Sequence, residues 1–343
     1  MKVIDIRSDT GTLPTNEMRE AMKMAVVGDD VCKDDVTTNK LEQIAATLLK
    51  KEKALFVPSG TFGNQLCLFT HCNRGDEVIL DDQCHIIQHE AGASSIIAGV
   101  QLRGITTKEG LMKIEEIESK IRKEINIHYP KTTLICLENA LSNGKVLSIE
   151  YMKSIYKLAK KYNLKVHLDG ARLFNAATAL NINVSEIAKY TDSITFCLSK
   201  GLCAPIGSLI VGTKEFINKA TFKRKIMGGG MRQTGVIAAP GIIALNKMTK
   251  RLYIDHENAN ILAKELDKNK EITVLKNNLD INMVFFTIDK NIDDTKMVAY
   301  FKKRNILIYP SEAKTYRFVT NCGVDKSDLY KIVETLNTFI AIS

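Results

Sequence analysis

Short apolar segments alternate with amphipathic helical segments from about residue 40 onward, and this alternation constrains the fold more than any other feature. Residues 39–51, for example, repeat apolar side chains at helical spacing and predict a helix. Strands that alternate with helices form a largely parallel sheet with helices on both faces, so the predicted fold class is α/β. The runs that predict strands are residues 54–60, 77–82, 100–105, 132–139, 164–170, 193–200 and 208–212. Because the last two runs lie so close together, we expect the last strand to return antiparallel.

The pattern changes beyond about residue 245. A long helical pattern, residues 241–269, leads into short strand patterns at 282–288 and 315–320. This change predicts two domains joined by one long helix: a large domain over residues 10–245 and a smaller C-terminal α+β domain over residues 246–343.

The composition argues against several classes of function. No apolar run approaches the ~18 residues of a membrane span, and the first ten residues lack the apolar core of a secretion signal, so we expect a cytoplasmic protein that binds no membrane. The net charge of +9 comes mainly from lysines that are spread along helices, which predicts a solvated surface and no nucleic-acid binding. The eight cysteines form no Cys-x-x-Cys pair, so we expect reduced core cysteines and no metal site.

Residues 58–64 follow a predicted strand and open a predicted helix. Ser59, Gly60 and Thr61 would present backbone N–H groups and hydroxyls at the helix N-terminus, an arrangement that binds phosphate. Ordinary helix caps use the same residue types, so this segment alone leaves both interpretations open.

Two further strands end in charged residues, where ligands of α/β sheets collect. Lys200 is either a solvated side chain at a strand end or an amine in a dry cleft that forms a Schiff base. Asp169 ends another strand, with Arg172 three residues later. Either these two residues pair with each other inside the protein, or Asp169 binds the protonated nitrogen of a pyridine ring and Arg172 binds an anionic group of a substrate.

His85 and Arg232 complete the candidate set. His85 follows a strand and is either a surface residue or a residue that stacks on an aromatic ring and acts as a base, with Glu90 placed to orient it. Arg232 follows three glycines, which suit close approach of a ligand or another chain, and it would bind phosphate. A phosphate cradle, a carboxylate for a pyridine nitrogen, a Schiff-base lysine and a stacking histidine are together the requirements of pyridoxal 5'-phosphate.

The chain resembles the low-specificity L-threonine aldolase family, within the aromatic amino acid β-eliminating lyase superfamily of fold type I pyridoxal-phosphate enzymes, whose fold is transferase-like. The segments that carry the resemblance are residues 4–22, 27–31, 54–66, 74–79, His85 with 90–93, 167–176, 196–208, 225–236, 255–259 and 316–320. The resemblance implies retro-aldol cleavage of L-threonine, L-allo-threonine or a related β-hydroxy-α-amino acid to glycine and an aldehyde.

The resemblance also implies a role for each candidate residue. Lys200 binds the cofactor covalently, Asp169 pairs with its ring nitrogen, and His85 stacks on its ring near the substrate hydroxyl. Cofactor phosphate binding falls to Ser59, Gly60 and Thr61, with Arg232 supplied by a neighbouring subunit. The substrate carboxylate is bound by Ser8, Arg172 and Arg317, so residues 1–9 contribute to the active site. Shared active sites imply a homodimer or homotetramer.

The chain departs from the family pattern on the substrate side. The family's second active-site histidine falls at Leu141, and the segment of residues 28–37 carries Cys32, Lys33 and Val36 in place of the family's tyrosine, glycine and proline. We therefore expect His85 to be the remaining base, and activity on threonine to be weakened or redirected. Two alternatives stay open: a β-eliminating lyase, or another Cα-carbanion enzyme, with a different amino-acid substrate; and a binding protein that keeps the cofactor without turnover, which would not need a complete carboxylate clamp.

Overall fold

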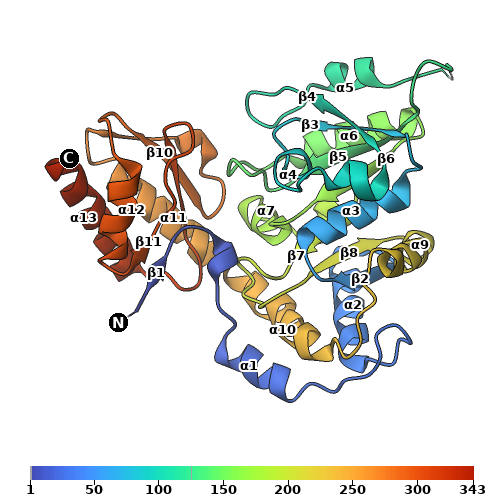
Figure 1. The fold of residues 1–343 in the computed structure, drawn as a ribbon, viewed down its shortest axis with the longest axis horizontal. Coiled ribbons are helices and arrows are strands. Elements are labelled where there is room, and N and C mark those ends of the chain that lie inside the picture. The colour runs from blue at the N-terminus through green and yellow to red at the C-terminus, as the bar shows by residue number, and fades with distance from the viewer. Residues whose placement is uncertain (1, 125) are drawn as a thin grey trace.

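A computed structural model describes residues 2–124 and 126–343. Its main sheet has seven strands in the order β2-β8-β7-β6-β5-β3-β4 (Figure 1). The strands from β7 to β4 are mutually parallel, and β8 runs antiparallel to both β7 and β2, which confirms the mostly parallel sheet and the antiparallel return. Their bounds are β2 Lys53–Val57, β3 Glu77–Asp81, β4 Gln101–Ile105, β5 Thr132–Glu138, β6 Lys165–Asp169, β7 Ser193–Cys197 and β8 Ser208–Gly212.

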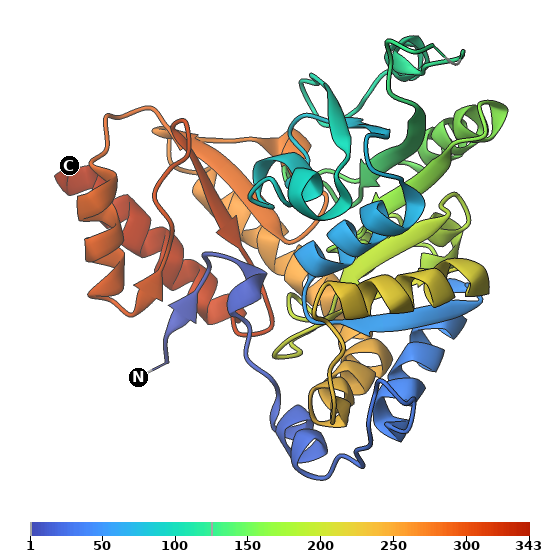
Figure 2. The same cartoon turned by 45° about the vertical axis from the view of Figure 1, so that its right-hand side comes forward.

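Helices cover both faces of this sheet because alternate residues of each strand point to opposite sides. Phe56 of β2 belongs to the core shared with α2 and α6, whereas its neighbours Leu55 and Val57 belong to the core shared with α3 and α9. In Figure 2, α3 and α9 lie side by side on that second face. The helices of this part of the chain are α1 Asn16–Lys23, α2 Val36–Leu49, α3 Gly60–His71, α4 His85–Gln88, α5 Ile114–Lys120, α6 Ile149–Lys161, α7 Leu173–Ala179, α8 Val184–Ala188, α9 Lys214–Ile226 and α10 Gly235–Asn246.

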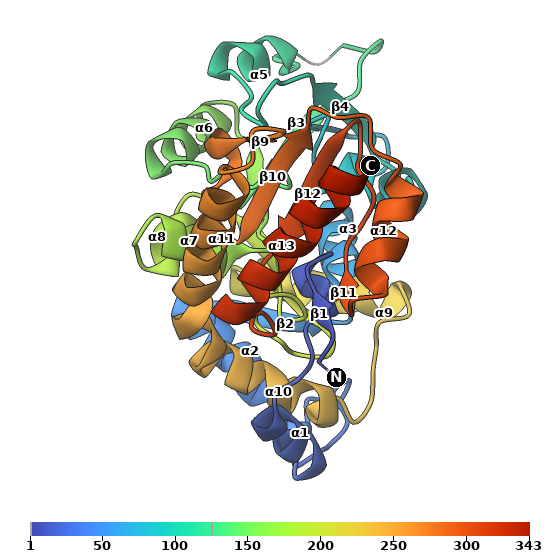
Figure 3. The same ribbon diagram turned by 90° about the vertical axis from the view of Figure 1, so that its left-hand side faces the viewer.

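A second hydrophobic core is built around a smaller antiparallel sheet in the order β12-β10-β9. Figure 3 shows α13 lying across β10 and β12. The elements are α11 Leu252–Leu266, β9 Ile272–Val274, β10 Met283–Ile288, α12 Asp294–Lys302, β11 Ile306–Leu307, β12 Thr315–Val319 and α13 Lys326–Ile342. This core matches the predicted α+β character of the C-terminal part, while the domain boundaries themselves stay a prediction.

The N-terminal strand β1, Ile4–Asp5, pairs parallel with β11. Ile4 and Ile6 are fully buried in the second core. The first residues of the chain therefore pack with its last third, a contact that the sequence analysis did not predict.

The prediction of a single long helix over residues 241–269 is wrong, because the chain forms two helices there. A 3₁₀ turn, Met248–Arg251, separates α10 from α11. The two helices pack in different places, α10 on α1 and α2, and α11 on α13 and β10 (Figure 1). One straight helix could not serve both cores. Among the described residues, the search for a helix with the length and apolarity of a membrane span finds none.

Candidate active site

The carboxyl ends of β5, β6 and β7 meet at one edge of the main sheet. Glu138 and Asp169 are the last residues of β5 and β6, and Lys200 follows β7 by three residues. Backbone hydrogen bonds continue past the strand ends, since the N–H of Asn139 donates to the carbonyl of Asp169 at 2.9 Å. Parallel strands thus bring these charged side chains together as the sequence predicts.

Helix α3 begins beside these strand ends. Ser59 caps it by accepting a hydrogen bond from the N–H of Phe62 at 3.1 Å, and the N–H groups of Gly60 and Thr61 precede the first intrahelical bond. A Cβ at Gly60 would lie 2.8 Å from the sulfur of Cys197, so only glycine fits. The hydroxyl of Ser208, 3.8 Å from that position, is buried and has no hydrogen-bond partner among the described residues. The turn therefore offers unused donors at a helix N-terminus.

A buried network holds Asp169 in place; its members are Asn64, Gln65, Glu90, His167 and Asp169. The amide nitrogen of Asn64, one turn into α3, donates to Asp169 Oδ2 at 2.7 Å and to Glu90 Oε1 at 2.8 Å. Its oxygen accepts a hydrogen bond from His167 Nε2 at 3.2 Å, and Gln65 donates to Glu90 Oε2 at 2.6 Å. Burial lowers the pKa of His167 to about 3, so its ring is neutral. Asn64 was not predictable as a site residue, because a mid-helix asparagine carries no visible signal in the sequence.

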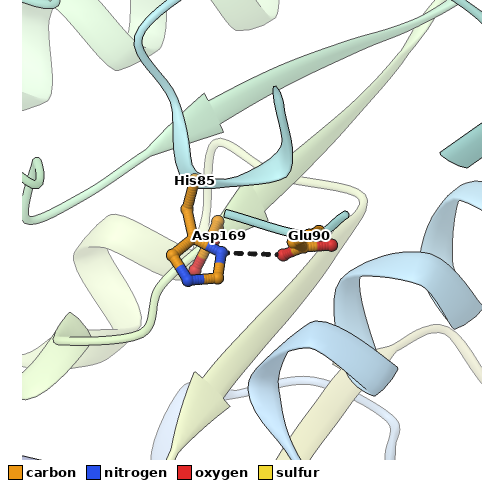
Figure 4. Close-up of side chains that lie close together, drawn as sticks. All are labelled: His85, Glu90 and Asp169. Atoms are coloured by element: carbon orange, nitrogen blue, oxygen red, sulfur yellow. Dashed lines mark hydrogen bonds and ion pairs between the residues drawn. The ribbon is translucent and has the colours of Figure 1, made fainter. Parts of the chain in front are cut away.

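His85 joins this network through Glu90. Its Nδ1 lies 2.9 Å from Glu90 Oε1, which confirms that Glu90 orients it (Figure 4). The hydrogen bond that Glu90 accepts from His85 raises the pKa of His85 against the opposing effects of burial and the Lys200 charge, and the charge of Asp169 adds to the rise. The backbone N–H of His85 also donates to Glu138 at 2.9 Å.

One potential ligand atom from each of His85, Glu90 and Asp169 lies within 4.8 Å of the others, a spacing that a metal ion could use. However, both oxygens of Glu90 and Oδ2 of Asp169 already accept hydrogen bonds from Asn64 and Gln65. The donors present suit a hydrogen-bonded cluster. That the protein needs no metal stays a prediction.

Arg172 pairs with Asp9, which excludes the internal Asp169–Arg172 pair that the sequence left open. Arg172 Nε and Nη2 lie 2.9 and 2.6 Å from the two carboxylate oxygens of Asp9. Burial tends to raise the pKa of Asp9, but the charge and hydrogen bonds of Arg172 outweigh it and hold the pKa below its usual range. Ser8, beside Asp9, is buried and caps a short 3₁₀ turn. The N-terminal segment therefore reaches the strand-end edge of the main sheet.

Arg317, on β12, reaches the same region from the second core. No carboxylate of the described residues forms an ion pair with it. Burial and the neighbouring Arg172 lower the pKa of Arg317. It lines a cavity of about 800 Å³ between the two cores, which we call the cleft. Other residues that line the cleft are Cys84, Gln88, His89, Glu138, Leu141, Ser142, Phe285 and Tyr309.

His89 is a cleft residue that the sequence analysis missed. Its ring centroid lies 5.5 Å from that of His85, and its side chain is exposed. The four-residue spacing between the two histidines was the available signal, because it places them one helical turn apart. Leu141 also lines the cleft.

Lys200 and Arg232 are placed differently from each other. The carbonyl of Lys200 accepts a hydrogen bond from Thr12 at 2.7 Å, and its amine is close enough to influence the pKa of both Asp9 and His85. Arg232 is 58% exposed and pairs with Asp29 at 2.8 Å. Within the described ranges, no hydrogen bond or ion pair links Arg232 to the other candidate residues. The chain thus brings together every candidate region except that of Arg232.

Comparison with known proteins shows the family to which this chain belongs. Residues 5–289 match the Beta-eliminating lyase family. The chain is 43% identical to low-specificity L-threonine aldolase 1 of Arabidopsis thaliana, over 96% of this chain and 94% of the relative. It is 41% identical to the low specificity L-threonine aldolase of Escherichia coli (strain K12), over 99% of this chain and the whole relative. The solved structure of Leishmania major threonine aldolase shares the fold, with a TM-score of 0.83 at 19% identity over 98% of this chain and 99% of that one. This chain therefore belongs to the β-eliminating lyase family and groups with its low-specificity L-threonine aldolases.

Proposed function

We propose that this protein is a pyridoxal 5'-phosphate-dependent aldolase that cleaves L-threonine, L-allo-threonine or a related β-hydroxy-α-amino acid to glycine and an aldehyde. The family and the names of its relatives support this reaction. The single structural observation that carries it is the position of Asp169, a buried carboxylate that Asn64 ties to the helix whose first N–H groups are free.

The residues present fit the cofactor. Its phosphate would be held by Ser59, Gly60 and Thr61, where unused donors lie at the start of α3. Its ring nitrogen would be held by Asp169, and Lys200 would supply the amine that binds its aldehyde. When bound, this cofactor supplies an electron sink for the pair left on the substrate Cα.

Two guanidinium groups would bind the substrate carboxylate. Arg317 has no carboxylate partner among the described residues, and the nearby positive charge of Arg172 makes an anion favourable there. Asp9 fixes the orientation of Arg172, and Ser8 lies next to Asp9. Fixing the carboxylate at two points sets which bond of Cα is aligned to break.

His85 is the base that we assign to the β-hydroxyl group. Because the carboxylate of Glu90 accepts a hydrogen bond at Nδ1, the other ring nitrogen is left free to take a proton. Leu141 has no hydrogen-bonding group to share this task. His89, which lines the cleft beside His85, is the second histidine near the proposed position of the β-hydroxyl group, and we assign it a role in assisting His85.

The exposed Arg232 supports the proposal of shared active sites. Within the part of the chain that the structure describes, its one ion pair is with Asp29. We propose that it contributes to the phosphate site of a neighbouring subunit in a homodimer or homotetramer, and that the protein acts in the cytoplasm on a free amino acid.

Product analysis tests the reaction. The reconstituted protein is incubated with threonine, allo-threonine, phenylserine and serine, and glycine, aldehyde, keto acid and ammonia are measured. Glycine with the matching aldehyde is the expected result. The apolar Leu141 favours one alternative, β-elimination from a different amino acid, which would yield keto acid and ammonia. Absence of glycine from all four substrates would remove the aldolase assignment.

A further inference from the structure

Two thiols meet where the turn after β12 packs against the core of the main sheet. The sulfur atoms of Cys203 and Cys322 lie 2.8 Å apart although the residues are 119 positions apart in sequence. Cys203 lies in the turn that follows Lys200, and Cys322 lies in the turn that follows β12. Cys203 is fully buried and Cys322 is half-buried. A disulfide needs the sulfurs at about 2.05 Å, so a small side-chain movement would join them.

The surroundings favour reaction at Cys322. Its hydrogen bond with Cys203 lowers the pKa of the Cys322 thiol, burial acts in the opposite direction, and the Arg251 guanidinium lowers it further. Arg251 is held in place by two hydrogen bonds to Asp255, at 2.9 and 3.1 Å. The thiolate is the nucleophilic form of cysteine, so the more accessible of the two thiols is also the more reactive one.

Hydrogen bonds connect the segments that carry the two thiols to two different parts of the candidate site. The N–H of Cys203 donates to the carbonyl of Lys200 at 2.9 Å. Asn321, which precedes Cys322, donates to the carbonyl of Asp5 at 3.0 Å, in the strand that begins the chain. A bond between the sulfurs would join the Lys200 turn to the strand that carries Arg317.

We propose that Cys203 and Cys322 form a reversible dithiol–disulfide pair that reacts with small-molecule disulfides. The Cys322 thiolate attacks one sulfur of oxidised glutathione, which forms a mixed disulfide and releases one glutathione thiolate. Cys203 then loses its proton and attacks the Cys322 sulfur, which releases the second glutathione. Two cysteine thiols become one disulfide, one glutathione disulfide becomes two thiols, and the two protons pass to the released glutathione.

Peptide mapping without reductant tests the pair. The full chain is incubated with oxidised glutathione, digested and analysed by mass spectrometry. We expect a cross-linked peptide that contains Cys203 and Cys322 and that disappears after reduction. In C203S, Cys322 is expected to keep the glutathione adduct, because the resolving thiol is absent; in C322S, Cys203 is expected to stay unmodified, because it is buried.

Matched controls separate this pair from the other cysteines. Cys84 is also half-buried, but burial raises the pKa of its thiol, so C84S is expected to leave the cross-link unchanged. The exposed Cys32 reports that oxidant is present, through its own adduct. A wild-type chain with the Cys32 adduct but no Cys203–Cys322 peptide would overturn the proposal.

Thermal unfolding gives a second readout. A disulfide that closes a long loop restricts the unfolded chain, so oxidation is expected to raise the Tm of the wild type and not that of C322S. If the cross-link forms in the oxidised wild type but the Tm does not change, the disulfide does not stabilise the contact between the two turns, and this part of the proposal is wrong. Neither measurement depends on catalysis, so its outcome is separate from that of the proposed reaction.

Discussion

The buried network and the cleft border each other but are built in opposite ways. In the network, Asn64 of α3 forms hydrogen bonds with Glu90 and with His167 and Asp169 of β6, and all four side chains are buried. In the cleft, Arg317 has no ion-pair partner among the described residues, and the lining comes from strands and loops on both sides. The network is therefore held in place before any ligand binds, whereas in the cleft the guanidinium of Arg317 is available to bind an anion.

This difference separates two kinds of property. In the proposed function, the preorganised network determines whether the cofactor binds and which protonation states it meets. In the proposed function, the cleft, where Arg317 has no ion-pair partner among the described residues, determines which amino acid enters, and single substitutions there can change that choice. Substitutions in or beside the network should therefore affect every substrate alike, whereas substitutions in the cleft should discriminate between substrates.

Removing the Lys200 amine should have the largest effect. Lys200→Ala is expected to lower turnover of every substrate on the order of 10⁴-fold or more, because the proposed covalent bond to the cofactor aldehyde can no longer form. Borohydride reduction followed by peptide mapping should label Lys200 in the wild type and nothing in the variant. Lys189→Ala, at an exposed lysine, is the control and should retain both label and turnover. A label on another lysine of the wild type would contradict the assignment.

Breaking the network should cost stability as well as activity. Asn64→Ala removes the donor shared by Asp169 and Glu90 and leaves two buried carboxylates with one partner fewer. The free energy of unfolding of the cofactor-free protein should fall by about 2 kcal/mol, measured by urea titration. Asn143→Ala, at the rim of the cleft, should change it far less. Equal losses in the two variants would mean that the network is no more constrained than the cleft.

The sequence could predict one of these regions better than the other. Asp169 and Lys200 were predictable because parallel strands must end at one edge of the sheet. Asn64 was not, since its contact with Asp169 spans 105 residues and depends on how α3 packs. The pairing of Arg172 with Asp9 was equally hidden, because it joins residues 163 positions apart. Contacts set by strand topology can be inferred from local pattern, whereas contacts set by packing between distant elements cannot.

In the cleft, removing the Arg317 side chain should lower kcat/KM without changing how the cofactor binds. Arg317→Ala is expected to lower kcat/KM on the order of 10²-fold, because a charge-assisted pair with the substrate carboxylate is lost. The visible absorbance of the bound cofactor should not change, since Arg317 is not among its proposed ligands. Arg317→Lys should recover part of the loss, because it keeps the charge without the planar fork. A variant with normal kcat/KM would show that Arg317 does not bind substrate.

The pH profile tests the link between the two regions. His85 must be neutral to act as a base, and its pKa is raised by Glu90 and Asp169 against burial and Lys200. The wild-type kcat/KM should therefore rise with increasing pH across a value above the ordinary histidine pKa. Glu90→Gln weakens the hydrogen bond that raises this pKa, so the acidic limb should move to lower pH. Glu109→Gln, at an exposed residue, should leave the limb in place; an unmoved limb in Glu90→Gln would separate His85 from the rate.

The smallest expected effect belongs to the second histidine. His89 lines the cleft and lies near His85, yet no hydrogen bond within the described residues fixes its side chain as Glu90 fixes His85. An unfixed imidazole can assist the β-hydroxyl group but cannot be relied on as its base, so His89→Phe should lower kcat/KM for threonine only about fivefold. The matched change at the exposed His128 should have no effect. If His89→Phe were instead as inactive as His85→Phe, with the cofactor spectrum intact, the base would belong to the cleft, and the network would serve only to hold the cofactor.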